Sequence, residues 1–257
     1  MNGAFYIGAL GLDAQQRALD VVANNIANIN TIGFKRQTTR FSELVAALRD
    51  GDDMPVAQSG ANETISGVAV SGTPHVWSQG EINITGQPYD LAISGNGFLE
   101  LMGPSGRPLL WRGGTLKVNE DGYLAASDGM VLRSMISVPQ SATNLSIAPN
   151  GIVSALVDGS AQPRQIGRID VAMVKDPDTL VDDGAGYYEA SDPSQVLTAE
   201  PGQEGSGQLV QGALESGNVQ LTTEMVTLML LQRAYAADAQ VVQAGDQLMS
   251  IANELRR

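Results

Sequence analysis

The sequence contains no cysteine and a single histidine, His75, among its 257 residues. The absence of cysteine excludes disulfides, thiolate metal sites and cysteine nucleophiles, and one histidine excludes a metal site with several imidazole ligands. No apolar run reaches about 18 residues, so we expect no insertion into a membrane. The N-terminus has no basic stretch followed by an apolar one, so we also expect no cleavable secretory signal peptide.

Charged residues are scarce as well, at 17% of the chain against about 25% in typical globular proteins. The net charge is nevertheless −13, and it is unevenly placed: residues 1–49 carry +2, residues 50–218 carry −14 and residues 219–257 carry −1. An acidic chain without clustered Lys and Arg lacks the means to bind phosphates, which excludes a nucleic-acid partner. Nearly neutral ends favour packing against other copies, whereas an acidic middle favours exposure to solvent.

The N-terminal segment, residues 1–49, is predicted to be helical and to mediate polymerisation. Residues 4–29 contain no proline and place Phe5, Leu12, Leu19 and Ile26 seven residues apart, which indicates a long amphipathic helix. Gly33 is available for a left-handed cap after the helix ends. Residues 41–48 are expected to form a short second helix.

The middle of the chain has the pattern of a β domain. Residues 50–66 are polar with interspersed Gly and Pro, and are expected to form a linker. Residues 67–212 consist of short aliphatic stretches broken by Gly, Pro or Asn, which predicts a β-rich outer domain. Four segments in it are expected to form hairpin turns, namely Asn119–Gly122, Ser127–Gly129, Pro149–Gly151 and Val157–Gly159.

The C-terminal segment, residues 213–257, is again predicted to be helical. The chain has no proline from Val219 to Leu255, Asn218 is available as an N-cap, and Leu228, Tyr235, Val242 and Met249 are seven residues apart. An apolar stripe of this length needs a covering surface, which the other terminal helix or neighbouring copies would supply. The expected fold is therefore α+β, with long N- and C-terminal α-helices forming a coiled-coil-like layer and an all-β middle domain.

Three asparagines near the end of the first helix have two interpretations. Asn is unfavourable inside helices, because its side chain competes for backbone hydrogen bonds. Asn24, Asn25 and Asn28 therefore either terminate the helix or use their amides to bridge neighbouring helices and fix their register. The sequence alone leaves both interpretations open.

The motifs that would indicate an enzyme or a metal site are incomplete. Gly95-Asn-Gly97 is half of a dinucleotide-binding fingerprint, and the Asp-rich stretches at 50–53, 176–178 and 182–183 lack the spacing of a calcium loop. His75 precedes Trp77 at an expected strand start and needs no catalytic role. We therefore predict no catalytic residue, no metal and no cofactor.

Several motifs, taken in order, resemble those of the bacterial flagellar rod and hook protein family. Ala23-Asn-Asn-Ile-Ala-Asn28 with Thr31-x-Gly-Phe-Lys-Arg36 is similar to the family's N-terminal signature. In the middle, Gln79-Gly80, Thr85-Gly-Gln-Pro88, Asp90-Leu-Ala-Ile93 and Gly95-Asn-Gly-Phe98 resemble its Q-G, T-G-x-P, D-[LV]-A-I and G-x-G-F elements. Gln211-Gly-Ala-Leu-Glu-Ser-Gly-Asn-Val219 and Gln232-Arg-Ala-Tyr235 are similar to Q-G-x-L-E-x-S-N-V and Q-R-A-Y, although Gly217 replaces the usual Ser and Leu110-Trp-Arg-Gly-Gly-Thr115 replaces Y-T-R-[DN]-G-[ST].

The resemblance implies a structural subunit that assembles with its own copies into a helical polymer. It is most like the distal rod members, with a proximal rod or hook-type subunit as the alternative. The implied location is the flagellar basal body, spanning the periplasm after type III export, and the implied partners are other rod subunits, the hook protein and surrounding ring proteins. The residues expected at subunit interfaces are Phe5, Leu12, Leu19, Asn24, Asn25, Ile26, Asn28, Leu228, Tyr235, Val242 and Met249.

Two other classes of function remain to be weighed against this one. An enzyme built on the β domain would need a polar cluster in a pocket, and the residue inventory offers almost none. A peripheral membrane protein would use its terminal helices, but such helices usually carry Lys and Arg on the polar face, whereas the C-terminal one is acidic on balance.

Overall fold

The chain folds into two units, each assembled from segments that are far apart in the sequence. The computed structural model describes residues 2–47, 64–104, 106–157, 162–203 and 205–254, without the side chains of 2–6, 43–47, 64–67, 248–249 and 252–253. The helical unit comprises Met1–Ala27, Gln37–Val76 and Gln220–Arg257, and the β unit comprises Asn28–Arg36 and Trp77–Val219. These two units are not divided at residues 49, 66 and 212, where the sequence predicts domain boundaries. The predicted domain boundaries therefore stay predictions.

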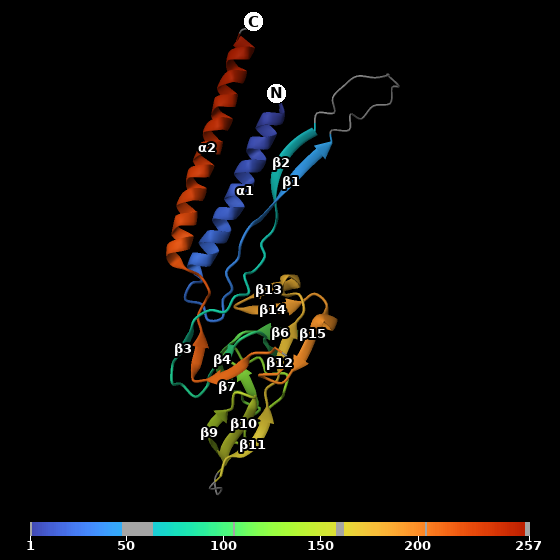
Figure 1. Ribbon diagram of the computed structural model, residues 1–257, viewed down its shortest axis with the longest axis vertical. Coiled ribbons are helices and arrows are strands. Elements are labelled where there is room, and N and C mark those ends of the chain that lie inside the picture. The colour runs from blue at the N-terminus through green and yellow to red at the C-terminus, as the bar shows by residue number, and fades with distance from the viewer. Residues whose placement is uncertain (1, 48–63, 105, 158–161, 204, 255–257) are drawn as a thin grey trace, which may run out of the picture. The chain divides into compact units, whose positions relative to one another are not determined.

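Two long helices dominate the helical unit. Helix α1 spans Asn2–Ala27 and α2 spans Leu221–Glu254, close to the expected ranges of 4–29 and 219–255 (Figure 1). Both form because long proline-free stretches repeat their apolar residues at helical spacing. Together with the β-rich middle of the chain they confirm the α+β class.

A β-hairpin replaces the short helix expected at 41–48, and that prediction was wrong. Strand β1 (Arg40–Ala47) pairs antiparallel with β2 (Thr64–Gly72), with Phe41 opposite Val70. Eight residues are too few for a stable isolated helix, whereas β2 supplies a pairing partner rich in β-branched residues. β2 also contacts α1. Residues 64–66 of the expected linker belong to β2, and residues 50–63 lie outside the described part of the chain.

The β unit consists of several small antiparallel sheets. The first four-stranded sheet has the order β16 (Gln208–Gln211), β4 (Asp90–Ser94), β7 (Gly113–Val118), β8 (Leu124–Ala126). The second has the order β13 (Leu180–Gly184), β14 (Tyr187–Ala190), β6 (Pro108–Trp111), β5 (Leu99–Met102). A three-stranded sheet has the order β11 (Arg164–Arg168), β10 (Ile152–Val157), β9 (Ala142–Ile147), and two pairs are β12 (Val171–Val174) with β15 (Val196–Ala199) and β17 (Ala213–Glu215) with β3 (Ile82–Ile84).

The larger of two apolar clusters in the β unit joins most of these sheets. Its members come from most of the strands and include Leu91, Ile93, Leu99, Leu101, Leu124, Val153, Val171 and Leu209, all at most 1% exposed. The described helical content of the β unit is limited to two short 3-10 turns, η1 (Pro177–Thr179) and η2 (Pro193–Gln195). The prediction of a β-rich middle is therefore confirmed.

The hairpin turns expected in the β unit are confirmed at three of the four positions. The amide of Gly122 donates to the carbonyl of Asn119 at 3.0 Å, and the corresponding amides of Gly129 and Gly151 close the next two turns at 2.9 Å each. All three glycines have positive φ, which glycine adopts at no steric cost. Most of the fourth turn, Val157–Gly159, lies outside the described residues.

Gly97 provides a test of this packing. It has a φ of +123°, and a Cβ at this position would lie 2.2 Å from Cγ1 of Val171. We expect Gly97→Ala to lower the free energy of unfolding of the β unit by at least ~2 kcal/mol, from backbone strain and overpacking combined. Gly86→Ala is the control, because Gly86 has a φ of +71° with no atom within 4 Å and should lose only ~1 kcal/mol. Chemical denaturation measures both, and equal losses would contradict the assigned close approach.

Candidate functional site: a buried charge cluster and an antiparallel helix pair

A fully buried carboxylate, that of Glu215, lies inside the β unit. Glu215 is 1% exposed and ends β17, where its backbone pairs with Ile82 of β3. Its carbonyl accepts the amide of Gly33 at 2.8 Å. Gly33 has the positive φ of +69° that its predicted capping role requires, but α1 already ends at Ala27. The turn at Gly33 therefore brings the segment after α1 against the segment before α2.

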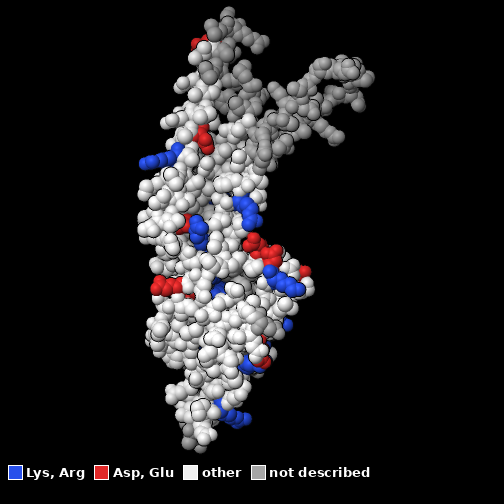
Figure 2. Space-filling view, viewed as in Figure 1, with Lys and Arg blue, Asp and Glu red and all other residues white. Residues whose placement is uncertain are grey.

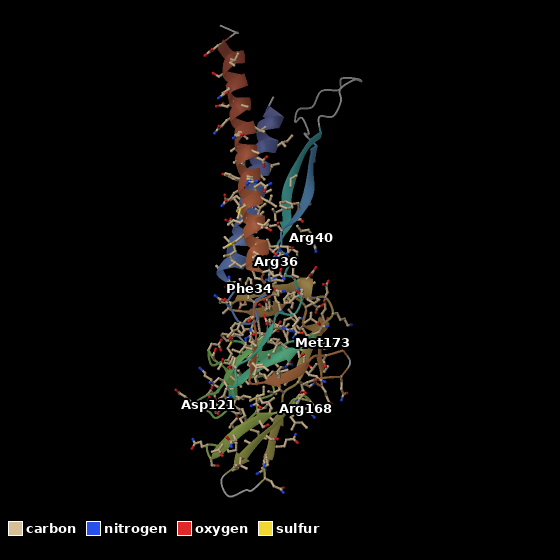
Figure 3. The ribbon with its side chains drawn as sticks, turned by 60° about the vertical axis from the view of Figure 1, so that its left-hand side comes forward. Phe34, Arg36, Arg40, Asp121, Arg168 and Met173 are labelled. Carbon is tan, nitrogen blue, oxygen red and sulfur yellow. The ribbon has the colours of Figure 1, made fainter. Side chains whose placement is uncertain are left out.

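Lys35 is the first cation that reaches this carboxylate. Its ammonium Nζ donates to Oε1 of Glu215 at 2.6 Å and to the carbonyl of Ser78 at 2.9 Å, and its side chain is 1% exposed. Figure 3 labels Phe34 and Arg36 on either side of it in the chain. Burial, followed by the neighbouring Arg112 guanidinium, lowers the pKa of Lys35 from its ordinary 10.5, and Glu215 offsets part of this effect.

Arg112 is the second cation and comes from the connection between β6 and β7. Its Nε and Nη2 donate to Oε2 of Glu215 at 3.1 and 2.8 Å. Nη1 donates to the carbonyl of Gly97, and Nη2 also donates to that of Gly95 at 3.0 Å. The guanidinium carbon lies 5.7 Å from the centre of the Phe98 ring, within cation–π range. The guanidinium therefore links the end of β17 to the turn at Gly95 and Gly97.

The cluster contains two cations and one anion. Hydrogen bonds from the protein replace water around the Glu215 carboxylate. Oε1 accepts a hydrogen bond from Nζ of Lys35 and one from the amide of Gly80 at 2.9 Å, and Oε2 accepts two hydrogen bonds from Arg112. A buried ion pair is tolerated only when such hydrogen bonds replace the lost water. Removing one member leaves an unpaired buried charge, which costs far more than the pair contributes.

An aromatic group packs beside the cluster. The ring centres of Trp77 and Tyr188 are 4.9 Å apart, and those of Trp77 and Phe98 are 5.5 Å apart, both edge to face. Tyr188 is 1% exposed. Its burial, with a further contribution from the negative charge of Asp182, raises the pKa of its phenol. These rings exclude water from the side of the cluster that Phe98 covers.

The cluster brings together motifs that sequence reasoning had listed separately. Lys35 belongs to the G-F-K-R segment, Gly80 to Q-G, Gly97 and Phe98 to G-x-G-F, and Glu215 to the L-E of the C-terminal motif. No spacing rule connects residues so far apart, so the sequence does not predict this site. The available signal was local: Lys35, Arg112 and Glu215 each directly follow or adjoin large apolar residues, where charged side chains are rare.

The helical unit contains a seam along which α1 and α2 run antiparallel. A Cβ at Gly8 would lie 2.7 Å from Cγ2 of Val242, and one at Gly11 would lie 3.6 Å from Oδ2 of Asp238. At the other end of the seam, Asn25 contacts Glu224. Small residues on α1 thus allow the larger side chains of α2 to approach its backbone closely.

Asn25 joins three segments of the helical unit. Its side chain is fully buried, with Oδ1 accepting the amide of Gln37 at 2.8 Å. Its Nδ2 donates to the carbonyl of Gln37 at 2.8 Å and to Oε2 of Glu224 at 3.2 Å. The interpretation of the asparagines as register-fixing amides therefore applies to Asn25 within a single chain. Asn24 is exposed on α1, and Asn28 in the β unit accepts the Thr31 hydroxyl at 3.1 Å.

The seven-spaced residues lie at or beside the seam. Leu12, Leu19 and Ile26 are half-buried on α1, next to the fully packed Ala18, Val22 and Asn25. On α2, Leu228 and Val242 are half-buried and Tyr235 is 38% exposed. The side chains of Phe5 and Met249 lie outside the described residues. Whether these residues meet other subunits stays a prediction.

The remaining surface of α2 is unusually apolar for an exposed helix. Its exposed large apolar side chains are Leu221, Met225, Val226, Met229, Leu230, Tyr235, Val241 and Ile251, between 38% and 69% exposed. Figure 2 shows few charged side chains over this helix. Asn218, the expected cap, lies before its first residue; its Oδ1 accepts the amide of Arg36 at 2.6 Å, and its Nδ2 donates to the carbonyl of Ser78 at 2.9 Å. A membrane-crossing helix is not found among the described residues.

Comparison with known proteins identifies similar chains over the full length. Three family models match: "Flagella basal body rod protein" at residues 5–35, "Flagellar hook protein FlgE/F/G D1 domain" at 92–155 and "Flagellar basal body rod FlgEFG protein C-terminal" at 210–255. The chain is 33% identical to the flagellar basal-body rod protein FlgG of Caulobacter vibrioides, over 98% of this chain and 99% of the relative. It is 32% identical to FlgG of Borreliella burgdorferi, over the whole of both chains, and 30% identical to FlgF of Caulobacter vibrioides, over 94% and 93%.

The charge cluster predicts a large difference between two glutamates. Glu215→Gln removes the anion and leaves Lys35 and Arg112 charged and buried, so we expect the free energy of unfolding to fall by ~3–5 kcal/mol. Glu189→Gln is the matched control, because the Glu189–Arg107 pair at 3.2 Å is exposed and should contribute ~0–1 kcal/mol. Urea denaturation measures both variants. Similar losses in the two would refute the central role of Glu215.

The lowered pKa of Lys35 predicts a pH effect. On raising the pH, the folded chain releases the Lys35 proton before the unfolded chain, whose lysine titrates near 10.5. In that window the unfolded state holds more protons, so this group makes the folded chain more stable as the pH rises. We therefore expect the unmodified protein to gain stability relative to Lys35→Met between neutral pH and 10.5. Parallel stability curves for the two proteins would show that Lys35 does not titrate in this window.

Proposed function

The chain belongs to the flagellar basal-body rod protein family, and we propose that it builds the rod by packing its helix pair against the helix pairs of neighbouring copies. It is a structural subunit of the basal-body rod, most like the distal members, and not an enzyme. Its place is the flagellar basal body. The observation that carries the proposed mode of assembly is the open apolar face of α2.

An apolar helix face of this kind needs a covering partner. Met225 and Met229 are one turn apart and 45% and 55% exposed, and Leu230 beside them is 60% exposed. Isolated exposed apolar residues are common, but a continuous row on one helix marks an interaction surface. The apolar side chains extend along most of α2, whose opposite side already packs on α1. Other copies of the same chain are therefore the natural partners for this face.

The open faces of the two helices differ, which favours an open polymer over a closed dimer. On α1 the exposed side carries Asp13, Gln16, Arg17 and Asp20 next to the half-buried row of Leu12, Leu19 and Ile26. On α2 the exposed side is mainly apolar. Contacts between unlike faces are heterologous, and heterologous contacts that do not close into a ring generate helical filaments.

The proposed polymer has the helix pairs inside and the β units outside. The inner helices would form the coiled-coil-like layer, using the seven-spaced residues and the asparagines at subunit interfaces. The β units, which carry most of the negative charge, would face outward. The proposed partners are other rod subunits, the hook protein and the ring proteins around a shaft that crosses the periplasm and transmits torque.

Met229 provides the test of this assembly mode. Met229→Glu adds a charge to a position that is exposed in the single chain, so monomer stability should change by less than ~0.5 kcal/mol. In a packed layer the same charge would be buried without a partner, so we expect loss of polymers by sedimentation and electron microscopy. Met229→Leu is the matched control, because it keeps an apolar side chain of similar volume and should still assemble. Normal polymers from the glutamate variant would rule out this face as an interface.

A further inference from the structure

One charged residue interrupts the open apolar face of α2. Between Glu224 and Asp238, Arg233 is the only ionisable side chain apart from Tyr235. It lies nine residues after Glu224, about two and a half turns along the helix, and so projects from the side opposite the seam. It is exposed, and the described residues offer it no hydrogen bond or ion pair.

The helix that carries Arg233 does not supply an anion at helical spacing. The residues one turn before it are Met229 and Leu230, and those one turn after it are Ala236 and Ala237. Ion pairs on a helix surface form between residues three or four apart. Arg233 therefore has no intrahelical partner, and its position in the Q-R-A-Y segment is not explained by packing within the chain.

The exposed face of α1 carries an aspartate without a cationic partner among the described residues. Asp13 is already paired with Arg17, whose Nε lies 2.9 Å from Oδ2 of Asp13. Asp20 accepts only an amide hydrogen bond, from Gln16 at 3.1 Å, and no described cation pairs with it. Asp20 is exposed and directly follows Leu19 of the half-buried row. An anion without a cation thus adjoins the apolar row that a neighbouring helix would cover.

We propose that Arg233 of one copy pairs with Asp20 of the next copy, within the contact between the α2 face of the first and the α1 face of the second. This inference rests on the proposed function and specifies how the copies are oriented. The apolar side chains around Arg233 would shield the pair from water, where it acts more strongly than on a free surface. A single charged pair within an apolar contact also fixes register, because a shifted alignment leaves both charges unpaired.

Cysteine cross-linking tests this contact directly, because the chain contains no cysteine of its own. Asp20→Cys and Arg233→Cys would be made separately, mixed, assembled and oxidised. We expect covalent dimers in the mixture well above the level given by either variant alone. Arg164→Cys, an exposed position on β11 of the β unit, replaces Arg233→Cys in the control mixture and should give few dimers. Polymers that yield no excess of dimers in the first mixture would overturn the pairing.

Charge exchange provides a second, independent measurement. Arg233→Glu and Asp20→Arg should each raise the protein concentration needed for assembly by roughly two- to five-fold, and the double variant should recover most of that loss. Arg164→Glu, with the same change in net charge, should have no such effect. Single variants that assemble normally, or a double variant that does not recover, would contradict the pairing while leaving the rod function intact. Failure of the unmodified chain to assemble at all would instead overturn the proposed function.

Discussion

The buried carboxylate of Glu215 is the interaction on which the architecture depends. It binds two cations that come from separate segments of the β unit, and it is also the last residue of the strand that precedes α2. Lys35, which it binds, follows α1 by only a few residues. The same group therefore stabilises the interior of the β unit and holds together the two segments that lead into the helices.

The helical unit is held together differently, by close packing between α1 and α2 rather than by a buried charge cluster. Gly8 and Gly11 leave room for Val242 and Asp238, so these side chains of α2 lie close to the backbone of α1. Asn25 then fixes the register by binding both the backbone of Gln37 and the carboxylate of Glu224. Helix α2 and strand β2 of the hairpin both pack against α1, so they cover much of its apolar surface within a single chain. The large apolar side chains that stay exposed in the helical unit are mainly those of α2.

The sequence predicts the elements better than their contacts. Long proline-free stretches with periodic apolar residues locate both helices to within a few residues, and Gly after Asn or Asp marks three turns. The residues of the strand at 40–47 suit a helix as well as a strand, and its partner β2 lies beyond a long intervening segment, so the local sequence does not distinguish the two structures. On α1 the pattern of large apolar residues selects Leu12, Leu19 and Ile26, whereas the seam uses small residues that carry no such signal. The charge cluster was missed because its members are single residues in separate motifs, and only tertiary structure brings them together.

The chain folds so that its two ends depend on each other. The contact between Asn25 and Glu224 spans 199 residues of sequence, and that between Lys35 and Glu215 spans 180. Contacts of such high sequence separation form late, because the entropy of closing a long loop must be overcome first. An incomplete chain that stops anywhere before the last β-strand has neither the anion for Lys35 nor the helix that covers α1. A truncated chain of this kind therefore completes neither the charge cluster nor the helix pair, so both folding units depend on the last residues to be joined.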